Sequence, residues 1–193
     1  MAASAALNER GYSGCVYRSA ASAYRIATAF RSFYETAMVE HRHLRRLETV
    51  WIEPPTYFVT TCARDRRPLF ARPETASILI DELKGARARH GWHVGRFVIM
   101  PDHLHLFCTY DGSSSSVPLS RFVGSFKEWT AKRLMAIGVE GPIRQKQFFD
   151  HLLRPLRRYD DKWTYVRENP VRAGLVAKAQ DWPFAGEIEA LDL

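Results

Sequence analysis

The sequence predicts an α+β fold, a ferredoxin-like sandwich in which helices cover one face of a small antiparallel sheet. The first observation is the order of the patterned segments, which is strand, helix, strand, strand, helix. Strands that follow one another directly pair antiparallel, and the connecting helices then cover the sheet. The second observation is size, because 193 residues with 46% hydrophobic content suffice for one core but not for two ordinary domains.

The first strand is predicted at residues 57–62, which are mostly β-branched or aromatic and come shortly after two prolines. An amphipathic helix is predicted over residues 74–90, because apolar residues recur there at helical spacing. Pro73 stands at its start and Gly91 just after its end, which are the positions these residues favour at helix termini.

Two further strands are predicted at residues 92–100 and 103–110, joined by a tight turn at 101–102. After a polar loop, a second helix is predicted over 118–136, with Ser116 as its cap. Six apolar residues are expected on or near one face of this helix: Leu119, Phe122, Val123, Phe126, Trp129 and Leu134.

The rest of the C-terminal part is predicted to form helices and loops that wrap onto this core. The segments concerned are 147–156, 160–169 and the tail around 182–184. This part is the helical extension of the sandwich, and it holds one of the two motifs described below.

The domain is predicted to span residues 49–186, followed by a tail of residues 187–193. Residues 1–48 form an N-terminal extension that is poorly patterned and carries no readable motif. Met38 lies close to the patterned region, so one hypothesis is that translation starts there, and another is that the first 37 residues are loosely packed.

The balance of charge favours a polyanionic partner, since 28 Lys and Arg against 21 Asp and Glu give a net charge of +7. The three cysteines, Cys15, Cys62 and Cys108, fit neither a disulfide framework nor a paired-cysteine zinc site. A reducing cytoplasm is therefore the expected location. We expect no membrane association, because the sequence has neither a signal segment nor an apolar run of roughly 18 residues.

The first motif is Met-Pro-Asp-His-Leu-His-Leu-Phe at residues 100–107. In a strand, His103 and His105 point to the same face, so two imidazoles converge where they can bind a divalent ion that polarises a phosphoryl oxygen. Such an ion needs further ligands, and Cys108 and Asp102 are out of phase with the pair. Taken alone, the pair also fits two surface or hydrogen-bonded histidines.

The second motif occupies residues 163–176. Tyr165 and Asn169 are four residues apart and so share one face of a helix that Pro170 should end. A hydroxyl and an amide oxygen can then reach the same site. The alternative is that Tyr165 packs against the core and Asn169 only caps the helix.

Together the two motifs resemble those of the REP-associated tyrosine transposases, which belong to the single-tyrosine HUH transposases, named for a His-hydrophobic-His pair. The resemblance rests on residues 100–106, on Tyr-Val-Arg-Glu-Asn-Pro-Val-Arg-Ala-Gly-Leu-Val at 165–176 and on Asp-Trp-Pro-Phe at 181–184. It extends from about Thr56 to Phe184 and leaves out residues 1–48.

The resemblance implies that Tyr165 is a nucleophile that attacks a DNA phosphodiester and leaves a 5′-phosphotyrosine link and a free 3′-hydroxyl. It also implies that His103 and His105 are the paired metal ligands and that Asn169 completes a Mg²⁺ or Mn²⁺ site. His151 is similar to a histidine of the family, for which we expect a supporting role. The expected partner is single-stranded or hairpin DNA, and the expected state is a homodimer or a monomer.

Tyr159 is the alternative nucleophile, but it lies in a basic turn and lacks an Asn four residues on. Its other possible role is to contact a phosphate or a base.

Basic residues dominate the segment 121–180, which contains thirteen Lys or Arg against six Asp or Glu. Eight of them (Arg144, Lys146, Arg154, Arg157, Arg158, Lys162, Arg167 and Arg172) are interleaved with Phe148, Phe149, Tyr159 and Trp163. This mixture is typical of proteins that follow a phosphate backbone and stack bases. The residues predicted to bind DNA are Arg154, Arg157, Arg158, Lys162 and Arg172.

The predicted function is therefore cleavage and rejoining of single-stranded DNA by a metal-dependent tyrosine transposase. Two other readings remain open: a domesticated DNA-binding protein that no longer cuts, and a metal-dependent phosphoesterase that uses water.

Overall fold

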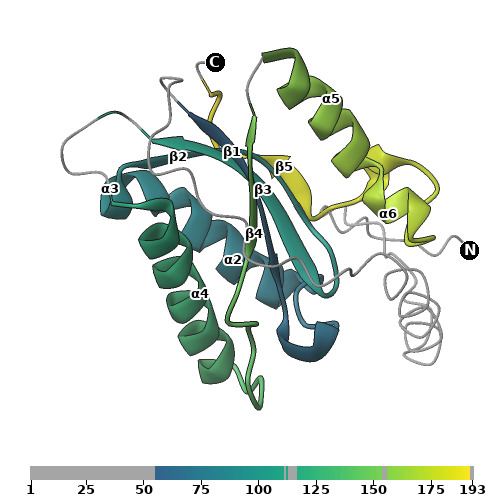
Figure 1. Cartoon of the computed structure of the whole chain (residues 1–193). Helices are drawn as coiled ribbons and strands as arrows, with labels where there is room; N and C mark the ends of the chain where they lie inside the picture. The colour runs from purple at the N-terminus through teal and green to yellow at the C-terminus, as the bar shows by residue number, and fades with distance from the viewer. Residues whose placement is uncertain (1–54, 111, 113–116, 154–155, 192–193) are drawn as a thin grey trace, which may run out of the picture. The chain divides into compact units, whose positions relative to one another are not determined.

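The computed structural model describes residues 55–110, 112, 117–153 and 156–191. For residues 156 and 157 it describes the backbone but not the side chains. This part of the chain contains one sheet in the order β4-β1-β3-β2-β5, in which all neighbouring strands are antiparallel (Figure 1). The first four strands and their two helical connections make up the predicted ferredoxin-like sandwich, so the predicted fold class is confirmed.

The three central strands begin and end close to their predicted positions, because their β-branched and aromatic residues suit a sheet that is covered on both faces. The other two strands lie at the sheet edges. The strands are β1 (Thr56–Cys62), β2 (Trp92–Ile99), β3 (His103–Tyr110), β4 (Phe149–Leu153) and β5 (Ala185–Glu187).

The helix predicted over 74–90 is two helices that meet at Gly85, and Gly91 ends the second with a φ of 68°. The helix predicted over 118–136 follows Pro118, and the predicted cap Ser116 lies outside the described residues. The α-helices are α2 (Pro73–Lys84), α3 (Ala86–His90), α4 (Leu119–Ala136), α5 (Leu156–Arg167) and α6 (Asn169–Arg172), and the 3₁₀ turns are η1 (Arg64–Arg66) and η2 (Ala179–Asp181).

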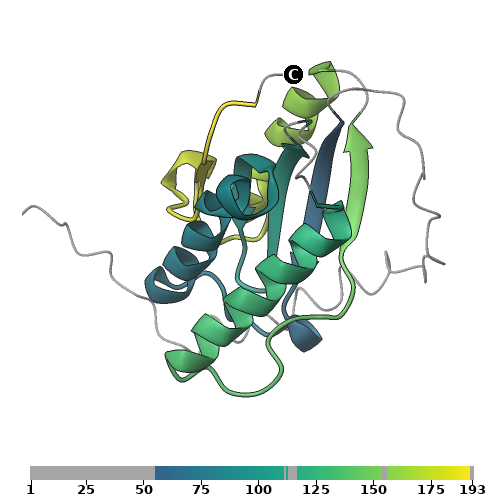
Figure 2. The same cartoon turned by 90° about the vertical axis from the view of Figure 1, so that its left-hand side faces the viewer.

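The helices lie on both sides of the sheet. Helices α2, α3 and α4 cover one face, with α4 and α2 in front of the strands in Figure 2, and α5 lies on the opposite side in Figure 1. Leu104 and Leu106 of β3 pack in the core under the first group, together with Phe122 of α4. Phe107 points the other way, and its ring centroid lies 4.7 Å from that of Tyr159 in α5. Each buried apolar side chain of this kind contributes about 1.5–3 kcal/mol.

One residue of the predicted apolar face of α4 is placed differently. Trp129 is half exposed and stacks on Lys132, while Thr130 is fully buried and donates a hydrogen bond to the Phe126 carbonyl. The hydroxyl can occupy the core because that bond satisfies it.

Strand β4 corrects the prediction of helices and loops at residues 147–156, and strand β5 follows directly after the predicted tail segment 182–184. Val59 of β1 pairs with Asp150, and Phe97 of β2 pairs with Gly186, so each short segment extends an existing edge of the sheet. The backbone of Glu189 also donates a hydrogen bond to the Val94 carbonyl, so backbone pairing with β2 continues past residue 186. Edge pairing, rather than local propensity, makes these residues extended.

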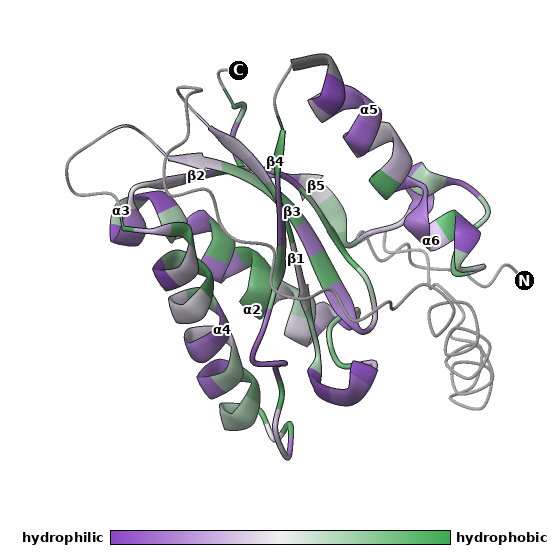
Figure 3. Cartoon of the chain, viewed as in Figure 1, coloured by the Kyte–Doolittle hydropathy of each residue, from purple (hydrophilic) through white to green (hydrophobic). Residues whose placement is uncertain are grey.

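Helix α5 starts at Leu156, four residues before the predicted start of that segment, and ends at Arg167, before Asn169 as predicted. Asn169 begins the separate helix α6, so Tyr165 and Asn169 do not share one face of a single helix, which corrects that prediction. It is mostly hydrophilic, in contrast to the strands it covers (Figure 3). Among the described helices, none combines the length and the apolar character that a membrane span requires.

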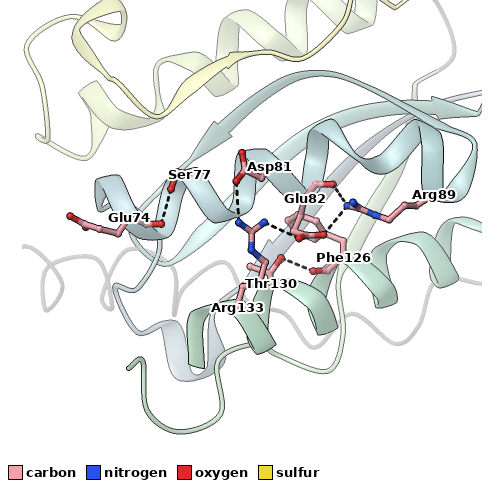
Figure 4. Close-up of polar contacts among 8 residues, drawn as sticks. All are labelled: Glu74, Ser77, Asp81, Glu82, Arg89, Phe126, Thr130 and Arg133. Carbon is pink, nitrogen blue, oxygen red and sulfur yellow. Dashed lines mark hydrogen bonds and ion pairs between the residues drawn. The ribbon is translucent and has the colours of Figure 1, made fainter. Parts of the chain in front are cut away.

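An ion network joins α2 to α4 on the other face of the sheet (Figure 4). Arg133 donates hydrogen bonds of 3.0 Å to both Asp81 and Glu82, and Arg89 donates one of 2.8 Å to Glu82. The Glu82 side chain is only 10% exposed, so two cations offset the cost of burying its charge. These contacts hold the helical layer together and leave the α5 side of the sheet for the site.

Candidate active site

His103 and His105 lie next to each other on the α5 side of β3, as the strand alternation predicts. Their ring centroids are 4.7 Å apart and the rings are nearly perpendicular, at 81°. The Leu between them points into the core under α2 and α4. The two imidazoles therefore face one small volume.

Both imidazoles are held through the nitrogen nearer the backbone. His103 Nδ1 lies 2.5 Å from Asp102 Oδ1, and His105 Nδ1 lies 2.8 Å from Thr60 Oγ1. Arg66 pairs with the other Asp102 oxygen at 3.0 Å. Among the contacts of the described residues none engages Nε2 of either ring, so both Nε2 atoms remain available to a ligand. This is the usual support for histidines that bind a metal.

The electrostatics keep these groups in the forms a cation needs. Burial, reinforced by the charges of His103 and Lys162, holds the pKa of His105 well below its usual range, so this imidazole is neutral at neutral pH. Burial alone would raise the pKa of Asp102, but its hydrogen bond with His103 and the charge of Arg66 hold that pKa below its usual value. The ionised Asp102 carboxylate orients the His103 ring.

The histidine pair is not part of a larger cluster of the usual metal ligands. In the described part of the chain no three or more His, Cys, Asp or Glu side chains gather where they could hold a metal. Cys62, which pairs with His103 across the sheet, accepts a hydrogen bond from Arg66, and burial raises the pKa of its thiol. A metal ion bound by this pair would need further ligands, such as an amide oxygen, water or a substrate phosphate.

Tyr165 lies on α5 with 61% of its surface exposed. The Lys162 ammonium is 5.7 Å from the centroid of its ring and 4.7 Å from that of Phe58. The Phe58 ring in turn stacks on His105, with centroids 5.2 Å apart. A continuous series of contacts therefore links the tyrosine to the histidine pair within one chain.

Asn169, the predicted third metal ligand, accepts a hydrogen bond from Arg172 through its Oδ1 atom. The same guanidinium donates to the Tyr165 carbonyl at 2.5 Å and lies 4.2 Å from the centroid of the Tyr165 ring. Arg172 thus holds Tyr165 and Asn169 together, at the start of α6. The described contacts do not bring Asn169 to the imidazoles, and its role as a ligand stays a prediction.

Of the residues predicted to bind DNA, three are described with their side chains. Arg158 is exposed and lines a hollow that it shares with Lys162, Tyr165 and His151. Arg172 is also exposed, beside Tyr165. Arg154 and the side chain of Arg157 lie outside the described residues.

Tyr159, the alternative nucleophile, is only 5% exposed. Its ring packs on Phe107, and the Arg96 guanidinium lies over it at 5.1 Å. Burial raises the pKa of its phenol, which disfavours the phenolate a nucleophile needs. A DNA phosphate can reach Tyr165 far more readily than Tyr159.

Arg144 does not belong to the basic surface with which the sequence groups it. Its guanidinium nitrogens are buried and have no hydrogen-bond partner among the described residues, and the group lies 4.2 Å from the Phe70 ring and 5.1 Å from the Phe126 ring. Burial lowers its pKa to about 9. It supports the core under β1 and does not face DNA.

Thr60 and Arg66 are the residues of the site that the sequence did not reveal. Strand alternation places Asp102 out of phase with the histidine pair as a metal ligand, and in the structure it instead supports His103. A carboxylate directly before a histidine pair is the one local signal for such a support. Thr60 has none, because only the pairing of Thr60 with His105 between β1 and β3 brings it there.

An antiparallel sandwich that carries paired histidines on a central strand and an exposed tyrosine on a nearby helix has the fold and site of the HUH class of DNA transposases. The chain belongs to the family described as "Transposase IS200 like", which matches residues 54–150. The REP-associated tyrosine transposase of Escherichia coli (strain K12) is 26% identical over 135 residues, which are 70% of this chain and 78% of that protein. The resemblance drawn from the motifs is therefore confirmed.

A solved structure of a REP-associated tyrosine transposase bound to a REP hairpin has the same fold. It superposes with a TM-score of 0.60 and 23% sequence identity, over 74% of this chain and 82% of that one.

Proposed function

We propose that this transposase cleaves and rejoins single-stranded DNA through a covalent link to Tyr165, beside a Mg²⁺ or Mn²⁺ ion held by His103 and His105. The observation that carries the proposal is the series of contacts from His105 through Phe58 and Lys162 to Tyr165. It means that one chain can present a phenol and two imidazoles to a single phosphodiester.

In the cleavage step the Tyr165 phenol oxygen forms a bond to the scissile phosphorus, and the bond from phosphorus to the 3′-oxygen breaks. The phenol proton leaves, and the departing oxygen gains a proton to become a free 3′-hydroxyl. The DNA on the other side stays attached as a 5′-phosphotyrosine. A 3′-hydroxyl that attacks this link reverses the step, so joining needs no ATP because the phosphodiester energy is retained.

The residues present fit the implied ion, because Asp102 and Thr60 engage the Nδ1 atoms of the two imidazoles and leave both Nε2 atoms available. When bound, Mg²⁺ or Mn²⁺ supplies positive charge to a phosphate oxygen. Asn169 is the proposed third ligand. Its amide oxygen has two lone pairs, so it can keep its bond to Arg172 and still face an ion.

Lys162 and Arg172 are proposed to bind the phosphate beside the nucleophile, since both cations lie against the Tyr165 ring. Arg154, Arg157 and Arg158 are proposed to contact the DNA backbone near the start of α5.

The proposed substrate is a hairpin or short palindromic repeat presented as single-stranded DNA. The likeness to a transposase bound to a REP hairpin supports this choice of DNA. The proposed location is the cytoplasm, and the protein acts as a monomer or a homodimer.

The test is a trapping assay with end-labelled hairpin oligonucleotides that carry single-stranded flanks. We expect a labelled adduct that resists SDS and disappears on protease treatment, and we expect excess EDTA to abolish it and added Mn²⁺ to restore it. Cleavage without an adduct would favour the phosphoesterase reading, and binding without cleavage the domesticated one. Either result would overturn the proposal.

Replacing Asp102 by Asn should lower the rate of adduct formation about 10- to 100-fold, the usual effect of losing a partner that orients a metal-binding histidine. The amide no longer provides the charge that fixes the His103 ring. The control is Asp65→Asn, at an exposed acid in the neighbouring turn with a φ of 54°, which Asn adopts readily. A normal rate for Asp102→Asn would show that this contact is unnecessary.

A further inference from the structure

An open hollow of about 260 Å³ lies between β4 and α5. Four of its residues lie on one face of α5 at positions i, i+3, i+4 and i+7, and two come from β4. It is lined by His151, Leu153, Arg158, Asp161, Lys162 and Tyr165. Pockets for drug-sized ligands are about 300–1,000 Å³, so a hollow of this size suits one ring system.

The hollow lies next to the proposed reaction centre, because Tyr165 forms part of its wall. His151 pairs with Phe58 across the sheet, and Phe58 is the ring that stacks on His105. The side chains of His151 and Leu153 share one face of β4 and offer an aromatic and an apolar surface for a base. A nucleotide whose phosphate meets Tyr165 therefore has room here for its base.

The hollow is lined by both basic and acidic side chains. Arg158 and Lys162 suit a phosphate, whereas the carboxylate of Asp161 repels one. Among the described residues, Asp160 of α5 forms an ion pair with Arg96, whereas Asp161 forms none. An unpaired carboxylate in a basic DNA site is suited to accept a hydrogen bond from the amino group of a base.

We propose that this hollow binds the base of one nucleotide beside the cleaved phosphodiester, and that Asp161 selects a base with an exocyclic amino group. The inference rests on the proposed cleavage by Tyr165. Cytosine, adenine and guanine carry such a group, and thymine does not. Asp161 is thus a specificity residue and takes no part in the chemistry.

The experiment uses the full chain and a pool of hairpin oligonucleotides whose single-stranded flanks are randomised. Adducts are isolated, and the DNA on both sides of the cleavage point is sequenced. We expect the wild-type protein to disfavour thymine about tenfold at one flanking position, which is the effect of one well-placed polar contact to a base edge. In Asp161→Asn this bias should fall to about twofold or change to another base, because an amide also donates.

The matched control is Asp160→Asn, the neighbouring acid, which pairs with Arg96 at 2.9 Å and is absent from the hollow. It should keep the wild-type bias, and both variants should keep the wild-type melting temperature. No adducts from the wild-type protein would overturn the proposed function itself. Adducts with the same base frequencies in wild type and Asp161→Asn would overturn only the role of Asp161.

Discussion

Replacing Tyr165 by Phe should abolish the covalent DNA adduct, with a loss of cleavage on the order of 10⁴-fold or more, as removal of a nucleophile that acts together with its site does. The ring can keep its contacts with Lys162 and Arg172, because both cations lie against the ring face. DNA binding should therefore be retained. The measurement is adduct formation on a labelled hairpin oligonucleotide, with affinity from a gel-shift titration.

The matched control is Tyr159→Phe, on the same helix. Within the described residues the buried Tyr159 hydroxyl makes no hydrogen bond of good geometry, so its removal should leave stability nearly unchanged and cleavage near the wild-type rate. An adduct in Tyr165→Phe that disappears in Tyr159→Phe would reverse the assignment. Such a result would require α5 to turn its buried face toward the DNA.

The fold could be predicted from the sequence where local pattern and tertiary structure agree. Residues 57–62 and 103–110 form strands because their β-branched and aromatic side chains suit a sheet that is covered on both faces. The segment at 149–153 has a Phe, an Asp and a His in succession, a mixture with no clear period. It becomes β4 only because β1 offers an unpaired edge, which no local pattern reveals.

The same distinction applies to the site. The spacing of His103 and His105 is enough to place both rings on one face, since alternation in a strand is a local property. The partner of His105 is Thr60, which is 45 residues away and depends on the register between β1 and β3. The register is set by the whole sheet and could not be read from either strand alone.

The burial of Arg144 is a second feature that the sequence does not predict. The sequence places Arg144 in the basic segment 121–180, among the residues interleaved with aromatics. Its planar guanidinium instead packs on two aromatic rings, Phe70 and Phe126, that come from distant parts of the chain. A planar guanidinium stacks on aromatic faces better than an ammonium does. This stacking explains how the Arg144 side chain is accommodated in the core.

Replacing either histidine of the pair by Gln should weaken Mn²⁺ binding and slow adduct formation by more than about 100-fold. The loss of a group that only orients a metal ligand costs about 10- to 100-fold, and the loss of the ligand itself should cost more. If both rings hold one ion, the double variant His103→Gln and His105→Gln should be no worse than the more impaired single variant. The measurements are Mn²⁺ affinity by electron paramagnetic resonance, without DNA, and the trapping assay.

His93→Gln is the control for replacing a histidine in this sheet. His93 lies on β2 and contacts Glu189 at 3.1 Å through Nδ1, outside the site. It should retain full Mn²⁺ binding and cleavage. Single variants that lose cleavage but keep Mn²⁺ affinity would mean that the rings act on the DNA directly. The imidazole pair would then hold the phosphate by hydrogen bonds, and the support from Asp102 and Thr60 would serve to orient donors instead of metal ligands.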